Sequence, residues 1–164
     1  MTMPSLPPLE RLTRFKNKLQ TLREELIALH REEKDIEQVV RTTAERMDRL
    51  LLDAWEAHFE PTTDITMVAV GGYGRKELNI HSDIDLLFLH SFSNPAEQAL
   101  ERSGITTFIQ FLWDIGLEVG QSVRTVDECL DQANQDITIM TNLLESRFLA
   151  GDHGRYQLFA DQIR

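Results

Sequence analysis

Two aspartates, Asp83 and Asp85, stand one residue apart where a run of apolar residues begins. Side chains at positions i and i+2 of a β-strand point to the same face, so a strand here would direct both carboxylates to one spot. Mg²⁺ prefers oxygen ligands and is commonly held by one or two carboxylates together with substrate phosphates. The pair therefore favours a metal site for phosphoryl or nucleotidyl transfer. The alternative is a structural carboxylate that is paired with an arginine elsewhere.

A phosphate-binding turn is the second candidate feature. Gly71 and Gly72 come between a predicted strand and a predicted short helix, where backbone N–H groups can approach a phosphate closely. Arg75 follows within the next turn and can grip a phosphate with two hydrogen bonds. Ser82 precedes the aspartates, and its hydroxyl serves equally well to close a turn or to contact a phosphate.

The elements that must position these residues are indicated by periodicity. From residue 9 to about residue 60 there is no glycine or proline, and apolar residues recur at three- and four-residue intervals. This pattern predicts two amphipathic helices, or one long helix with a break near 32–35. The charged outer face of these helices is interpreted as a solvated surface. The alternative interpretation is a docking surface for a partner.

Strands and helices alternate in the rest of the chain. The pattern predicts strands over 65–70, 84–90 and 117–125, a short helix over 75–78, and helices over 97–115, 127–132, 137–150 and from 152 onward. Such alternation predicts an α/β (α+β) fold, in which a small mixed sheet with flanking helices follows the N-terminal helical pair. We expect a helical extension over 1–60 and a second unit over 61–164.

Charge and composition restrict the class of protein. The chain has 164 residues, a net charge of −10 and one cysteine. The negative charge argues against broad nucleic-acid binding, which requires lysine and arginine. No basic-then-apolar leader and no apolar run of about 20 residues is visible, so we expect a soluble, cytoplasmic protein with no membrane partner. The single cysteine fits a reducing compartment.

The motifs resemble a known superfamily. The Gly71-Gly72 pair and the Asp83-Ile84-Asp85 triplet, separated by ten residues, resemble the signature of the DNA polymerase β-like nucleotidyltransferases. Over about 65–155 the chain is similar to the N-terminal catalytic region of the bacterial PII-protein uridylyltransferase/uridylyl-removing enzymes. The segments that carry this second resemblance, besides the glycine and aspartate motifs, are 111–120, 122–125, 136–138, 143–147 and 149–152.

The resemblance implies a nucleotidyltransferase-like fold and a reaction. Members transfer UMP from UTP to a tyrosine of the PII nitrogen-regulatory protein, release pyrophosphate and require Mg²⁺ or Mn²⁺. It implies that Asp83 and Asp85 are catalytic metal ligands. It also implies that the triphosphate is held by Gly71, Gly72, Ser82 and Arg75. Glutamine sensing and uridylyl removal belong to further domains that 164 residues do not accommodate, so we expect a fragment of a longer enzyme or a stand-alone relative.

One part of the superfamily pattern stays open in the sequence. A third carboxylate usually lies on a later strand, where Glu118 is the only acid, while Gly120 and Ser122 occupy positions that could have carried one. We take Glu118 as the candidate catalytic base, with Asp136 as the alternative. Two other functions remain possible for such a chain. One is a nucleotide-binding or regulatory module without turnover, and the other is a related transferase that uses another nucleotide or acceptor.

Overall fold

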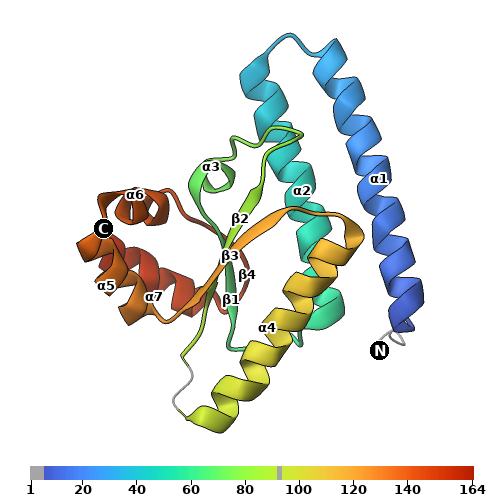
Figure 1. Cartoon of the computed structure of the whole chain (residues 1–164). Helices are drawn as coiled ribbons and strands as arrows, with labels where there is room; N and C mark the ends of the chain where they lie inside the picture. The colour runs from blue at the N-terminus through green and yellow to red at the C-terminus, as the bar shows by residue number, and fades with distance from the viewer. Residues whose placement is uncertain (1–5, 92–93) are drawn as a thin grey trace.

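A four-stranded mixed sheet lies at the centre of the described chain (Figure 1). The structure is a computed structural model that describes residues 6–91 and 94–164. The strands are β1 (Thr66–Ala69), β2 (Ile84–Leu89), β3 (Val119–Arg124) and β4 (Arg147–Gly151). Their order is β3-β2-β1-β4, in which β2 and β3 are parallel and the other two pairs are antiparallel. The predicted small mixed sheet is thus confirmed.

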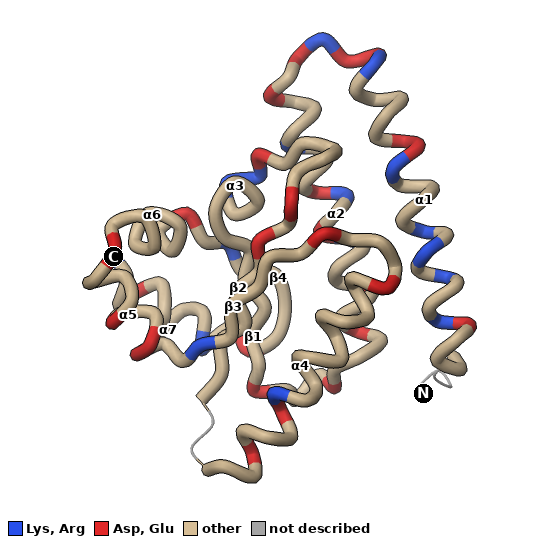
Figure 2. Tube along the Cα trace, viewed as in Figure 1, with Lys and Arg blue, Asp and Glu red and all other residues tan. Residues whose placement is uncertain are grey.

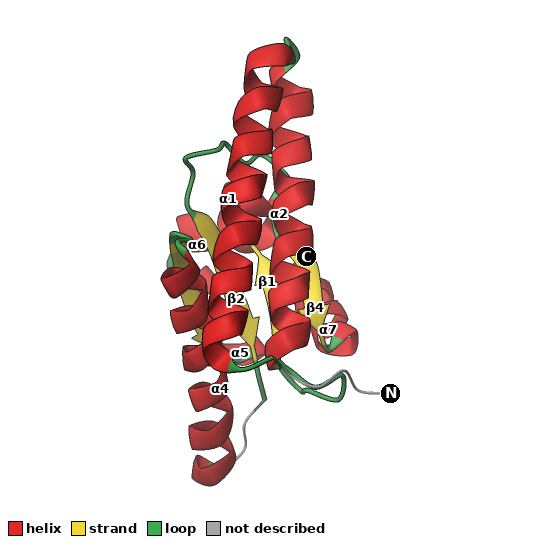
Figure 3. Ribbon diagram, turned by 90° about the vertical axis from the view of Figure 1, so that its right-hand side faces the viewer, coloured by secondary structure: helices red, strands yellow, loops and turns green. Residues whose placement is uncertain are grey.

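Two long helices precede the sheet, as predicted. Helix α1 (Pro8–Glu32) and helix α2 (Ile36–His58) lie side by side in Figures 1 and 3. The break falls at 33–35, within the predicted interval, because Asp35 caps α2 by accepting hydrogen bonds from the amides of Glu37 and Gln38. The predicted division near residue 60 falls in the connection between α2 and β1, and the division itself stays a prediction.

Helices cover both faces of the sheet because the strand residues alternate. In β2, Leu86 and Phe88 pack in a core cluster with α1, α2 and α4 (Pro95–Ile115). Their neighbours Leu87 and Leu89 pack in a second cluster on the other face. That face is covered by α5 (Val126–Gln135), α6 (Ile137–Leu144) and α7 (His153–Ile163). The result is a three-layer arrangement with the sheet between two groups of helices (Figure 1).

Two predicted elements differ in the structure. The short helix α3 is Gly71–Gly74 rather than 75–78, because Gly71, with φ of +62°, turns the chain directly after β1. The predicted helix over 137–150 is divided into α6 and β4. The chain forms β4 instead of continuing the helix because β1 would otherwise have an unpaired edge. Strand β4 supplies the antiparallel partner at that edge.

Among residues 6–91 and 94–164, no helix is long and apolar enough to cross a membrane.

Candidate functional site

The glycine turn sits at the end of β1. Four backbone hydrogen bonds hold it: the amides of Gly74, Arg75, Lys76 and Glu77 donate to the carbonyls of Val70, Gly71, Tyr73 and Gly72, at 3.2, 3.1, 3.1 and 2.9 Å. A Cβ on Gly74 would lie 2.1 Å from the carbonyl oxygen of Glu145, so only glycine fits there. The turn is therefore rigidly bonded, while Gly72 on its outer side remains partly accessible.

The two aspartates lie next to this turn. Asp85 is exposed in β2 between Ile84 and Leu86, which are 2% and 1% exposed, and Asp83 is exposed just before the strand. A Cβ placed on Gly71 would lie 3.6 Å from Oδ2 of Asp85, so the glycine turn and the carboxylate are adjacent. Figure 2 shows acidic positions at the start of β2 beside α3.

The electrostatics of the pair favour a cation. Partial burial, and then the charge of Asp83, raise the pKa of Asp85 above its usual value. A divalent cation between the two carboxylates would remove this repulsion. The described residues contain no group of three or more histidine, cysteine and acidic side chains placed to hold a metal. Two carboxylates completed by phosphate oxygens and water nevertheless fit the preference of Mg²⁺.

Strand β3 approaches Asp85 closely. Gly120 is the register partner of Asp85 across the parallel β2–β3 pair. A Cβ on Gly120 would lie only 2.6 Å from Oδ1 of Asp85. The glycine therefore makes room for the Asp85 carboxylate, and the position beside it on β3 carries no acid.

The two candidates for a third carboxylate lie elsewhere. Glu118 is exposed just before β3, and its backbone carbonyl accepts a hydrogen bond of 3.0 Å from the amide of Ile84. It borders a cavity of about 390 Å³ together with Ser82. Asp136 caps α6, where its side chain accepts from the amide of Thr138 at 2.8 Å. The structure thus brings Glu118 to the same end of the sheet as Asp83, and gives Asp136 a local structural role.

The two predicted phosphate-contacting side chains have different surroundings. Arg75 is exposed and forms ion pairs with Glu77, at 3.1 Å, and with Glu145. Its guanidinium must exchange at least one of these partners to bind a phosphate. Ser82 is exposed, and its backbone amide closes a turn onto the carbonyl of Asn79 at 3.1 Å.

Asn142 is a further candidate site residue, and the sequence did not predict it. It is exposed on α6, and its side-chain oxygen lies 3.8 Å from the Cβ position of Gly71, where Asp85 also approaches. No motif identifies it, because α6 reaches the glycine turn only through the fold. An asparagine side chain offers both donors and an acceptor to a bound ligand.

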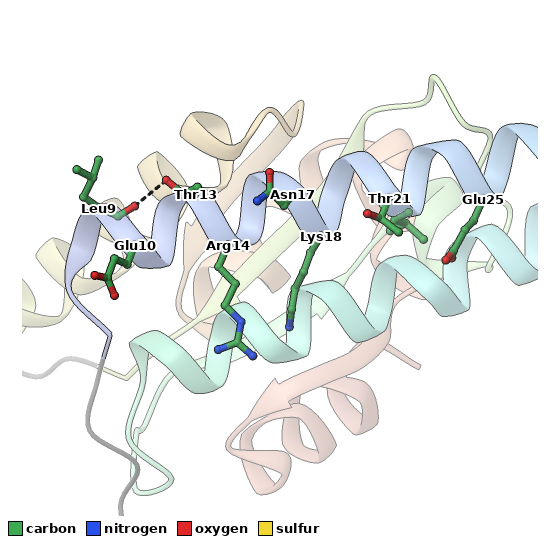
Figure 4. A pocket seen from close by; sticks show the side chains of 9 residues that line it. Leu9, Glu10, Thr13, Arg14, Asn17, Lys18, Thr21 and Glu25 are labelled. Carbon is green, nitrogen blue, oxygen red and sulfur yellow. Dashed lines mark hydrogen bonds between the residues drawn. The ribbon is translucent and has the colours of Figure 1, made fainter.

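A broad depression along α1 lies away from these groups. It has a volume of about 830 Å³ and is lined entirely by residues of α1 between Leu9 and Glu25. Figure 4 shows Arg14 and Lys18 extending together from this helix, with Thr13 bonded back to Leu9. None of its lining residues belongs to α3, β2 or β3.

Comparisons with known proteins bear on this site. A family model described as glutamate-ammonia ligase adenylyltransferase matches residues 11–114. A bifunctional uridylyltransferase/uridylyl-removing enzyme of Pseudomonas fluorescens (strain SBW25) is 47% identical over 138 residues, which is 84% of this chain and 15% of the relative. Enzymes of the same name from Pseudomonas putida (strain W619) and Azotobacter vinelandii are 48% and 44% identical, over 84% and 88% of this chain. The chain spans about 15% of the length of these curated relatives.

Proposed function

The chain belongs to the family of bifunctional uridylyltransferase/uridylyl-removing enzymes, and we propose that it carries their metal-dependent nucleotidyl-transfer site. In this proposal UMP passes from UTP to a tyrosine of the PII nitrogen-regulatory protein, and pyrophosphate leaves. The observation that carries the proposal is the proximity of Gly71 to the Asp85 carboxylate, with Asp83 beside them. It brings a close-approach backbone turn and two carboxylates to one place at the end of the sheet.

The chemistry assigns a task to each group. The tyrosine oxygen attacks the α-phosphorus, the bond to the pyrophosphate oxygen breaks, and the tyrosine proton passes to a base. Asp83 and Asp85 would hold Mg²⁺ or Mn²⁺, which offsets phosphate charge and aligns the attacking and leaving oxygens. Glu118 is the proposed base, since it is exposed at the same end of the sheet.

The rest of the turn binds the triphosphate in this proposal. Gly71 and Gly72 allow the phosphates to approach the backbone, and Ser82 adds a hydroxyl from the following loop. Arg75 releases Glu145 or Glu77 and pairs with a phosphate. Its exposed position makes this exchange inexpensive, because exposed ion pairs contribute little stability.

Two observations support alternatives. The family match described as an adenylyltransferase favours a related transfer from ATP to another acceptor. The glycine at position 120, where an acid would stand next to Asp85, favours a nucleotide-binding module without turnover. Both alternatives use the same turn and aspartates. They differ from the proposal in the nucleobase that is bound and in the product.

A nucleotide titration separates these possibilities. UTP, ATP, CTP and GTP are titrated into the protein with and without Mg²⁺, and then into Asp83→Asn, with Asp53→Asn as a matched exposed control on α2. The proposal expects metal-dependent binding that favours UTP, is lost in Asp83→Asn and is unchanged in Asp53→Asn. Preference for ATP would favour the adenylyl alternative. Binding without transfer to added PII protein would favour the module, and binding that survives in Asp83→Asn would refute the assigned role.

A further inference from the structure

A buried network joins helix α2 to the glycine turn. Tyr73 lies in the turn and is 1% exposed, and its hydroxyl donates a 2.5 Å hydrogen bond to Oδ1 of Asp48 on α2. Arg147, the first residue of β4, donates to both oxygens of Asp48 at 2.6 and 3.2 Å. The side chains of Arg147 and Asp48 are only 19% and 17% exposed, unlike those of the other ion pairs among the described residues.

The side chain of the same arginine also donates hydrogen bonds to backbone carbonyls of the turn. Its Nη2 donates to the carbonyl of Tyr73 at 2.9 Å, and its Nε donates to the carbonyl of Gly74 at 3.4 Å. Its guanidinium carbon lies 5.1 Å from the centre of the Tyr73 ring. Three elements that are far apart in the sequence, α2, α3 and β4, therefore meet at this one guanidinium.

The surroundings of Tyr73 keep its hydroxyl protonated. Burial, and then the neighbouring charge of Asp48, raise the pKa of Tyr73 well above its usual value. The hydroxyl remains protonated and donates to the carboxylate. Asp48 in turn accepts from both partners, so the charge of Arg147 is compensated where it is shielded from water.

We propose that Asp48, Tyr73 and Arg147 are positioning residues, through which the N-terminal helical pair fixes the glycine turn beside the two aspartates. This rests on the proposed function, because it names the turn as the triphosphate site. The helical pair is then part of the transfer site rather than an appended surface. The geometry supports this assignment: the bonds end on the carbonyls of Tyr73 and Gly74, within three residues of Gly71.

The test compares three variants of the whole chain. Asp48→Asn keeps the shape of the side chain and removes its charge, and Tyr73→Phe removes only the hydroxyl. Asp53→Asn is the matched control, since Asp53 is on the same helix and pairs with Lys18 at 3.2 Å without contacting the turn. For each we measure amide hydrogen exchange over 70–78, the dissociation constant for UTP with Mg²⁺, and the midpoint of thermal unfolding.

We expect exchange at Gly74, Arg75 and Glu77 to accelerate at least about tenfold in Asp48→Asn, and less in Tyr73→Phe, because these amides carry the bonds of the turn. We expect the dissociation constant to rise about tenfold in Asp48→Asn, as for a displaced binding group. Asp53→Asn should match the wild type in both. Tyr73→Phe keeps the charge pair, so it reports on the turn if Asp48→Asn does not fold.

Several results would overturn the proposal. A lowered unfolding midpoint with unchanged exchange in the turn would make the network merely structural. A loosened turn with unchanged UTP affinity would show that the turn does not set nucleotide binding. If the wild type bound no nucleotide, the proposed function would fail, yet the exchange arm would still decide whether α2 holds the turn.

Discussion

Gly120→Ala is the substitution that probes the proposed metal site most directly. The added Cβ would lie 2.6 Å from Oδ1 of Asp85, whereas ordinary contact begins at 3.4 Å. The carboxylate must therefore move by about 0.8 Å, or the two strands must separate. Gly120 itself is exposed and has ordinary backbone angles, so alanine introduces no backbone strain.

The cost of this displacement can be bounded. Mg²⁺ demands near-ideal geometry at about 2.0–2.1 Å from its ligands. A misplacement of about 1 Å in a positioned group costs about a hundredfold in rate. We therefore expect Gly120→Ala to weaken metal-dependent nucleotide binding by about tenfold, and any transfer by up to about a hundredfold. Its unfolding free energy should change by less than about 1 kcal/mol, because alanine is less disfavoured than glycine inside a strand.

The assay is a titration of a nucleotide at several Mg²⁺ concentrations, combined with urea unfolding. Ser122→Ala is the control, since Ser122 lies two positions along the same strand and is paired with Leu87 rather than Asp85. Undiminished metal dependence in Gly120→Ala would refute the reasoning, because the Asp85 carboxylate would then have no fixed place in the proposed metal site. A large loss of stability would instead show that the strands themselves had moved.

Three further predictions concern stability and reactivity. Burial lowers the pKa of His58 below the unfolded 6.5, so the folded protein loses stability as pH falls. In His58→Gln the free energy of unfolding in urea should therefore depend less on pH between 7 and 5. The control His30→Gln, at an exposed histidine, should leave this pH dependence unchanged. Burial raises the pKa of Cys129 to about 11, so native protein should resist a thiol reagent at pH 8 until denatured. Gly104→Ala should raise the unfolding free energy by about 0.8 kcal/mol, since its Cβ meets Phe59 at an ordinary 3.8 Å inside α4.

The sequence predicted the elements whose signals are local. The break between α1 and α2 follows from the Asp35 cap, and β1 and β2 follow from runs of apolar residues. Strand β4 was missed because its apolar residues continue a helical pattern from α6. What separates the two is the long-range pairing with β1, including the approach of Gly151, at φ of +96°, to the carbonyl of Ile65. Such pairing between distant segments cannot be predicted from a short window of sequence.

The site shows the same division between local and long-range signals. The spacing of the glycines and aspartates can be seen directly in the sequence. The proximity of Gly71 to Asp85 follows from the antiparallel pairing of β1 with β2. The role of Asp48 has no local signal, since it is one of many acids on a charged helix. Its long-range partners, Tyr73 in the glycine turn and Arg147 on β4, 99 residues away, distinguish it from a solvated side chain.

The same strand geometry limits where the base for the proposed reaction can stand. At position 120 an acid would need the space that Oδ1 of Asp85 occupies, so the base cannot come from the register partner of Asp85 without displacing it. Glu118 precedes Gly120 by two residues, the spacing that places side chains on one face of an extended chain. It stands before the first residue of β3, two residue rises, or about 6.6 Å, from Gly120 if the chain there is extended. The proposed reaction therefore requires the acceptor tyrosine to approach from the end of the sheet that bears Asp83, and Glu118→Gln should lower transfer while leaving metal-dependent nucleotide binding intact.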